Sequence, residues 1–144
     1  MGREEGRTAV ALIAEMEKLL PILAASADAN LKSIGDSLRA AVEKLRETVQ
    51  WVSKTFPSNP AAVAAGSVYV LKLMGITLGG WMLARSAEIA SRQLAKGEGE
   101  ADFLKAKILT TRFFADHVMS QAPSLALAIT RGSESVLAVE EAML

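Results

Sequence analysis

The chain of 144 residues has no cysteine, one histidine, four prolines and few aromatic residues, which make up 5% of the sequence. The absence of cysteine excludes disulfides, thiolate metal sites and cysteine nucleophiles, and it is typical of a protein in a reducing compartment. An excess of charge is lacking too, since 16 Lys and Arg balance 16 Asp and Glu. This balance argues against a nucleic-acid partner, which needs a basic surface, and against a polybasic membrane anchor.

A secretory signal peptide is not predicted either. The first residues, MGREEGR, carry mixed charge rather than a basic patch followed by an apolar run. Together with the missing cysteines, this leads us to expect a cytoplasmic protein. The length fits one domain, residues 1–144, with a core of its own.

What the sequence does have is helical periodicity along most of its length. Ala and Leu abound, and apolar residues do not alternate with polar ones as they would in strands. The pattern predicts helices at about 8–25, 28–56, 60–96, 100–131 and 133–139. Long helices joined by short turns predict an all-α fold, an up-and-down antiparallel helical bundle of four main helices with a short extra helix at the C-terminal end.

The clearest amphipathic helix is 28–56. Asp28 is a suitable N-cap, and the face opposite the apolar one is rich in Lys, Arg and Glu. Pro21 should interrupt the end of the first helix, and Pro123 should break or kink the fourth. Apolar residues recur at spacings of three and four: Leu31, Ile34, Leu38, Val42, Leu45, Val49, Val52 and Phe56.

The third helix, 60–96, is the most informative stretch. Asn59 can cap it, Pro60 suits its first position, and Gly97 can end it. Its first two-thirds are apolar on nearly every side, so we expect its neighbours to enclose it. Lys72 near mid-span argues against a membrane-spanning segment.

Four glycines lie inside this helix: Gly66, Gly75, Gly79 and Gly80. Each costs about 1 kcal/mol relative to alanine in a helix interior, so a compensating contact is expected. Gly75 and Gly79 share a face, which would allow another backbone to approach closely. We therefore expect all four glycines to serve helix packing.

No motif in the sequence carries chemistry. His117 stands beside Asp116, but HExxH, a GxSxG nucleophile elbow and phosphate-binding glycine loops are all missing. We predict no catalytic, cofactor-binding or metal-binding residue in this chain.

The scarce aromatic residues are candidates for core or interface positions. Phe113 and Phe114 are adjacent on a helix, about 100° apart, so one can fill the core while the other reaches a neighbour. Trp81 follows the glycine pair on a helix with little polar surface. These three residues form the predicted domain or subunit interface.

From residue 59 onward the sequence resembles a known family. The features that carry the likeness are Tyr69 with Leu73, the triplet 79–81, Lys107 and the run RFFADH at 112–117. They resemble the C-terminal accessory domain of bacterial acyl-CoA dehydrogenases, including enzymes similar to 3-methylmercaptopropionyl-CoA dehydrogenases. Met119-Ser120 departs from the family pattern, in which Leu-Pro is expected.

The resemblance implies a role without chemistry. In that family the FAD, the acyl-CoA pocket and the catalytic glutamate belong to the preceding dehydrogenase domains. We therefore expect a non-catalytic accessory domain that supports assembly or packs on the catalytic core of an FAD-dependent acyl-CoA dehydrogenase. Its partners would be the dehydrogenase catalytic domains or further copies of itself, because bare apolar faces favour a homo-oligomer. The alternatives are a stand-alone homo-oligomeric interaction protein and a bundle that binds an apolar ligand.

Overall fold

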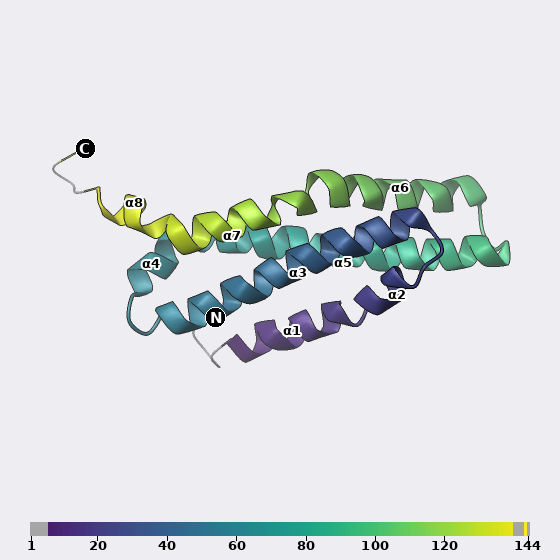
Figure 1. Ribbon diagram of the computed structural model, residues 1–144. Coiled ribbons are helices and arrows are strands. Elements are labelled where there is room, and N and C mark those ends of the chain that lie inside the picture. Colours follow the sequence, from purple (N-terminus) through teal and green to yellow (C-terminus); the bar gives the residue numbers. More distant parts are fainter. Residues whose placement is uncertain (1–5, 140–142, 144) are drawn as a thin grey trace.

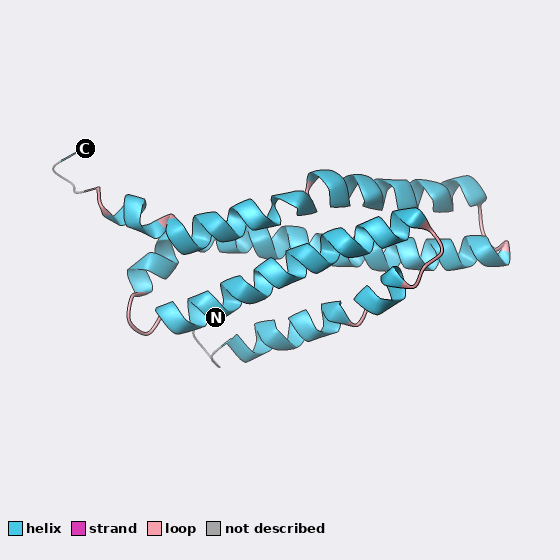
Figure 2. Ribbon diagram, in the orientation of Figure 1, coloured by secondary structure: helices cyan, strands magenta, loops and turns pink. Residues whose placement is uncertain are grey.

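The computed structural model describes residues 6–139 and 143, and no strand occurs among them (Figure 2). Long helices run back and forth along one axis, which confirms the predicted all-α bundle (Figure 1). The elements in chain order are α1 (Arg7–Glu17), α2 (Leu20–Ala24), α3 (Ala29–Thr55), α4 (Pro60–Ala65), α5 (Ser67–Lys96), α6 (Ala101–His117), the 3-10 helix η2 (Met119–Gln121), α7 (Ala122–Arg131) and α8 (Ser133–Leu137).

Helix α3 is the centre of the bundle, since it packs against α1, α2, α5, α6 and α7. Helix α5 packs on α3, α6 and α7, and α7 continues roughly the line of α6 beyond η2 (Figure 1). The short helices α4 and α8 contact each other at one end of the bundle. The core is therefore a seam along α3 to which the other long helices contribute.

The predicted apolar stripe of α3 forms most of this seam. Asp28 caps the helix as expected, because its carboxylate accepts a hydrogen bond from the Asn30 amide at 2.8 Å. Phe56, expected to extend the stripe, is 48% exposed because it follows the last turn of α3 at the helix cap. The other stripe residues are buried: Leu31, Ile34, Leu38, Val42, Leu45, Val49 and Val52.

Two predicted helices are broken, and in each the break lies upstream of a proline. The proline ring crowds the carbonyl group four residues earlier, so a regular helix cannot run through that position. Four residues before Pro21 is Glu17, where α1 ends. Four residues before Pro123 is Met119, where η2 begins after the end of α6. The continuous helices 8–25 and 100–131 are thus each divided, and the prolines lie in the first turns of α2 and α7.

The predicted third helix is also divided, at Gly66. Asn59 caps α4 as expected, accepting a hydrogen bond from the Ala62 amide at 3.0 Å. An added Cβ on the buried Gly66 would lie 3.4 Å from Cα of Ile129. The glycine therefore allows close approach of the α7 backbone, and α5 starts afresh at Ser67. Helix α5 then continues through Gly79-Gly80 and ends at Gly97, whose φ of 68° is left-handed.

Gly80 is the glycine of α5 that is most tightly packed. A Cβ added there would overlap Sδ of Met119 and lie 2.8 Å from its Cγ. Met119 is 1% exposed, so its side chain has little room to move. At Gly79 an added Cβ would meet only the Phe114 ring, at an ordinary 3.5 Å. The two adjacent glycines thus lie in different environments.

We expect Gly80→Ala to lower the free energy of unfolding by roughly 1–3 kcal/mol through overpacking against Met119. The matched control, Gly79→Ala, should be neutral or raise it by up to about 1 kcal/mol, because alanine is the better helix former. Urea denaturation of both variants measures the difference. Equal midpoints would mean that Met119 relaxes freely.

Two fully buried threonines differ in how their hydroxyl groups are satisfied. Thr77 Oγ1 donates to the Leu73 carbonyl at 2.8 Å, within α5. Thr48 on α3 is 0% exposed, and its Oγ1 has no hydrogen-bond partner among the described residues. A buried hydroxyl without a partner opposes folding.

Thr48→Val should therefore raise the free energy of unfolding by about 1 kcal/mol, since a methyl group replaces the unsatisfied hydroxyl. Thr77→Val is the matched control and should not stabilise, because it removes a hydrogen bond. Thermal denaturation followed by circular dichroism compares them. A stabilisation of equal size in both variants would contradict this account.

Candidate interaction surface on helices α5 and α6

Helix α5 is not enclosed on all sides within the described chain, and this corrects the expectation from its composition. Its neighbours α3, α6 and α7 cover only one side. That side carries the buried residues Leu73, Ile76, Thr77, Gly80, Ala84, Ala87 and Ala90. The opposite side is uncovered: Val68 and Leu71 are each 73% exposed, and Met82 is 54% exposed.

The uncovered residues of α5 form one continuous stripe. Val68, Leu71, Gly75, Met82 and Ile89 are separated by three, four or seven positions, which places them on one helix face. Such regularity indicates a surface rather than scattered exposed side chains.

Helix α6 extends this surface. The Thr111 hydroxyl donates to the Leu83 carbonyl at 3.2 Å, and the Phe114 ring lies beside Gly79, so the two helices run side by side. Phe103 and Phe113 on α6 are 56% and 62% exposed. The term α5–α6 face below denotes Val68, Leu71, Gly75, Met82, Ile89, Phe103 and Phe113.

Gly75 lies at the middle of the α5 stripe and is exposed. An added Cβ there would meet no atom within 4 Å. The expected packing role of Gly75 is therefore not found within the described chain, because no other described helix reaches this side of α5. Its helix-propensity cost of about 1 kcal/mol has no compensating contact in the bundle.

The predicted interface aromatics lie in three different places. Phe113 belongs to the α5–α6 face, and its ring centroid lies 4.5 Å from that of His117. Phe114 is partly buried and packs against the core. Trp81 is also partly buried, lies 5.1 Å from the Arg85 guanidinium and lines a surface groove with Leu12 of α1. Trp81 thus borders α1 and lies outside the α5–α6 face.

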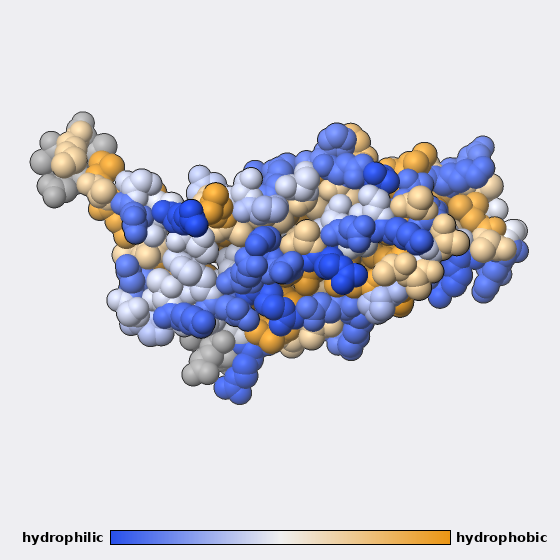
Figure 3. All heavy atoms as spheres, viewed as in Figure 1, coloured by the Kyte–Doolittle hydropathy of each residue, from blue (hydrophilic) through white to orange (hydrophobic). Residues whose placement is uncertain are grey.

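Charge is distributed unequally between α5 and α3. Lys72 is the only charged residue of the sequence between Ser67 and Ala84. On the side seen in Figure 3, by contrast, hydrophilic side chains cover much of α3 and also occur along α6. The exposed charged residues of α3 include Lys32, Asp36, Arg39, Glu43 and Glu47. The α3 side is a surface for water, whereas the α5 side has the composition of an interface.

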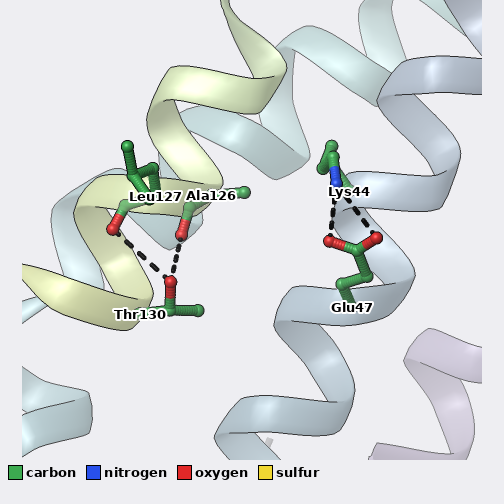
Figure 4. Close-up of polar contacts among 5 residues, drawn as sticks. All are labelled: Lys44, Glu47, Ala126, Leu127 and Thr130. Atoms are coloured by element: carbon green, nitrogen blue, oxygen red, sulfur yellow. Dashed lines mark hydrogen bonds and ion pairs between the residues drawn. The ribbon is translucent and has the colours of Figure 1, made fainter.

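Away from the face, Arg46 of α3 pairs with Glu17 of α1, and other polar contacts lie within single helices. Lys44 donates to both carboxylate oxygens of Glu47, at 3.0 and 2.8 Å (Figure 4). This hydrogen bond raises the pKa of Lys44 above its ordinary value. The Thr130 hydroxyl donates to the Ala126 carbonyl at 3.0 Å and to that of Leu127 (Figure 4). None of these contacts brings reactive groups together.

Beside His117, Asp116 forms an ion pair within its own helix. The Asp116 carboxylate accepts hydrogen bonds from Arg112 Nε at 2.9 and 2.8 Å. Asp116 is thus paired with the guanidinium one helical turn away. Across the described ranges, 6–139 and 143, no three His, Asp or Glu side chains gather where they could hold a metal ion.

Of the described helices, only α5 is long and apolar enough to cross a membrane, and 33% of its apolar window is buried. The core helix of a soluble protein passes the same test, so this is weak evidence for a membrane protein.

Sequence reasoning missed the uncovered stripe of α5 and Phe103 of α6. The spacing of Val68, Leu71 and Met82 was visible in the sequence. Because the opposite side of the helix is equally apolar, composition alone did not distinguish the core side from the free side.

Fold and surface together define a helical bundle with one uncovered apolar side. The model of the family described as acetyl-CoA dehydrogenase C-terminal like matches residues 12–140, so the chain belongs to this family. The family match confirms the resemblance and extends it to the first two predicted helices, where the sequence alone showed only generic alanine-rich helices.

One relative gives the comparison more detail. The 3-methylmercaptopropionyl-CoA dehydrogenase of Ruegeria pomeroyi (strain ATCC 700808 / DSM 15171 / DSS-3) is 41% identical over 83 residues. The match covers 58% of this chain and 14% of the relative. The chain therefore corresponds to a small part of that enzyme's length.

Because Phe114 packs on the core and Phe113 does not, their alanine variants should differ. We expect Phe114→Ala to lower the free energy of unfolding by roughly 2–3 kcal/mol. At protein concentrations at which the chain is monomeric, Phe113→Ala should change it by less than about 0.5 kcal/mol, as is usual for surface substitutions. Denaturant unfolding monitored by tryptophan fluorescence measures both. A larger loss for Phe113 would mean that its ring is covered in solution.

Proposed function

We propose that this chain is a non-catalytic accessory domain of an FAD-dependent acyl-CoA dehydrogenase, and that it supports assembly of the enzyme. The observation that carries the proposal is the apolar α5–α6 face in a chain of this family. Exposed apolar surfaces of this extent mark sites of protein–protein contact. A domain that acts by packing needs such a face and needs no reactive groups.

The polar side chains support the non-catalytic part of the proposal. A general base must be positioned beside the proton that it removes, and its pKa must be suited to that task. The carboxylates of Glu47 and Asp116 are instead on the surface and paired with basic residues of their own helices. The FAD, the acyl-CoA and the reacting groups would accordingly belong to the catalytic domains.

The proposed partners follow from the same features. The catalytic domains of the dehydrogenase would contact this bundle, whereas balanced charge gives no basis for nucleic-acid binding. We place the domain in the cytoplasm without a membrane partner. Its metabolic role would be that of the enzyme that it supports, the oxidation of acyl-CoA.

The test is to purify the chain and measure flavin absorbance and acyl-CoA oxidation with an artificial electron acceptor. We expect neither, because the chain would bind no FAD. The R. pomeroyi dehydrogenase, assayed in parallel with its own substrate, is the positive control. Flavin bound to the isolated chain, or turnover by it, would refute the non-catalytic role.

A further inference from the structure

We propose that the partner of the α5–α6 face is a second copy of this chain. The two α5 helices would pack antiparallel about a two-fold axis that passes beside Gly75. This inference deepens the proposed function and rests on it, since it names self-pairing as the way in which the domain supports assembly.

The α5 stripe is self-complementary about Gly75. Val68 lies seven positions before this glycine and Met82 lies seven positions after it. In an antiparallel pair centred on Gly75, Val68 of each copy therefore faces Met82 of the other. Leu71, four positions before the centre, faces Gly79, four positions after it, whose missing side chain leaves room for it. Apolar residues thus face apolar residues, as an isologous interface requires.

The open space at Gly75 fits this arrangement. Its missing side chain is unfilled within the bundle, where an added Cβ would meet no atom within 4 Å. At the centre of a helix pair, however, two glycines allow the backbones to approach closely. The self-pairing supplies the contact that offsets the glycine's cost in helix propensity.

Charge does not oppose the pairing. Lys72 is the only charged residue in the part of α5 from Ser67 to Ala84. The two-fold axis places each Lys72 opposite Leu78 of the other copy, against which its methylene groups can pack. The two Lys72 residues are offset by six positions, or about 9 Å along the helix axis, so like charges are not directly opposed.

The size of the face is close to what a stable dimer buries. Six of its seven residues are large apolar side chains exposed by 43% to 73%. If each of these six side chains buries roughly 100 Å² of surface, about half of what an aromatic residue buries, together they bury on the order of 600 Å² per copy. With their flanking residues this approaches the roughly 800 Å² per partner of a standard interface.

Sedimentation equilibrium of the full chain provides the first test. We expect a dimer, and Met82→Glu should weaken self-association by roughly 100-fold because it would bury an unpaired charge. Ile22→Glu is the matched control, since Ile22 is 53% exposed against 54% for Met82 and lies on α2. The control should remain dimeric, and circular dichroism establishes that both variants are folded. A strict monomer at the highest concentration would overturn the proposal, with the face then assigned to a catalytic domain.

Cysteine cross-linking tests the axis itself, because the chain has no cysteine of its own. Two cysteines form a disulfide only when their Cα atoms lie within about 7 Å. A mixture of Val68→Cys and Met82→Cys chains, oxidised with copper phenanthroline, should give the cross-linked heterodimer in clear excess over either variant alone. Ile22→Cys should not cross-link in the same conditions. A dimer that persists in Met82→Glu and shows no Val68–Met82 cross-link would place the interface elsewhere and refute this pairing.

These outcomes are separable from those of the proposed function. Flavin binding and turnover report on chemistry, whereas sedimentation and cross-linking report on association. A monomeric chain without flavin would refute self-pairing and leave the accessory role standing.

Discussion

The fold depends on the close packing of α5 against α3, α6 and α7. This packing covers one side of α5 only. From Gly80 onward, the buried residues of that helix are small: Gly80, Ala84, Ala87 and Ala90. Small residues let neighbouring helices approach the α5 backbone, and the Thr111 hydroxyl of α6 indeed donates to a backbone carbonyl of α5. The same hydroxyl lies 2.9 Å from the Lys107 carbonyl of α6 itself, so it is shared between the two helices. Close packing on this side of α5 leaves the opposite side facing outward.

The outward side is the feature with functional consequence. Helix α3 buries its apolar stripe and shows charged residues to water, as a helix of a soluble domain does. Helix α5 is apolar on both sides, yet the chain supplies helices for one of them. The chain belongs to the family described as acetyl-CoA dehydrogenase C-terminal like, and its match to one dehydrogenase covers 14% of that enzyme. A domain that packs against the rest of such an enzyme would need a free apolar side. The proposed function therefore rests on the surface that the described bundle leaves uncovered.

The sequence was sufficient for features that depend on neighbouring residues along the chain. The caps at Asp28, Asn59 and Gly97 and the buried stripe of α3 were all predictable, because each is determined within a few residues. The sequence predicted that Pro21 and Pro123 interrupt their helices. The breaks themselves lie about four residues upstream of each proline, near the carbonyl group that its ring would crowd. The surroundings of each glycine were not predictable, because the neighbour of Gly66 is Ile129, more than sixty residues away.

Gly75 and Gly80 show why one helix can serve two purposes. Five positions on a helix correspond to a rotation of about 500°, which leaves the two residues about 140° apart. Gly80 therefore lies against Met119 in the core, whereas Gly75 faces away from the bundle. A glycine with a neighbour inside the fold is explained by the fold itself. A glycine in the middle of a helix with open space around it is costly to the isolated bundle. This cost is the observation on which the proposed self-pairing rests.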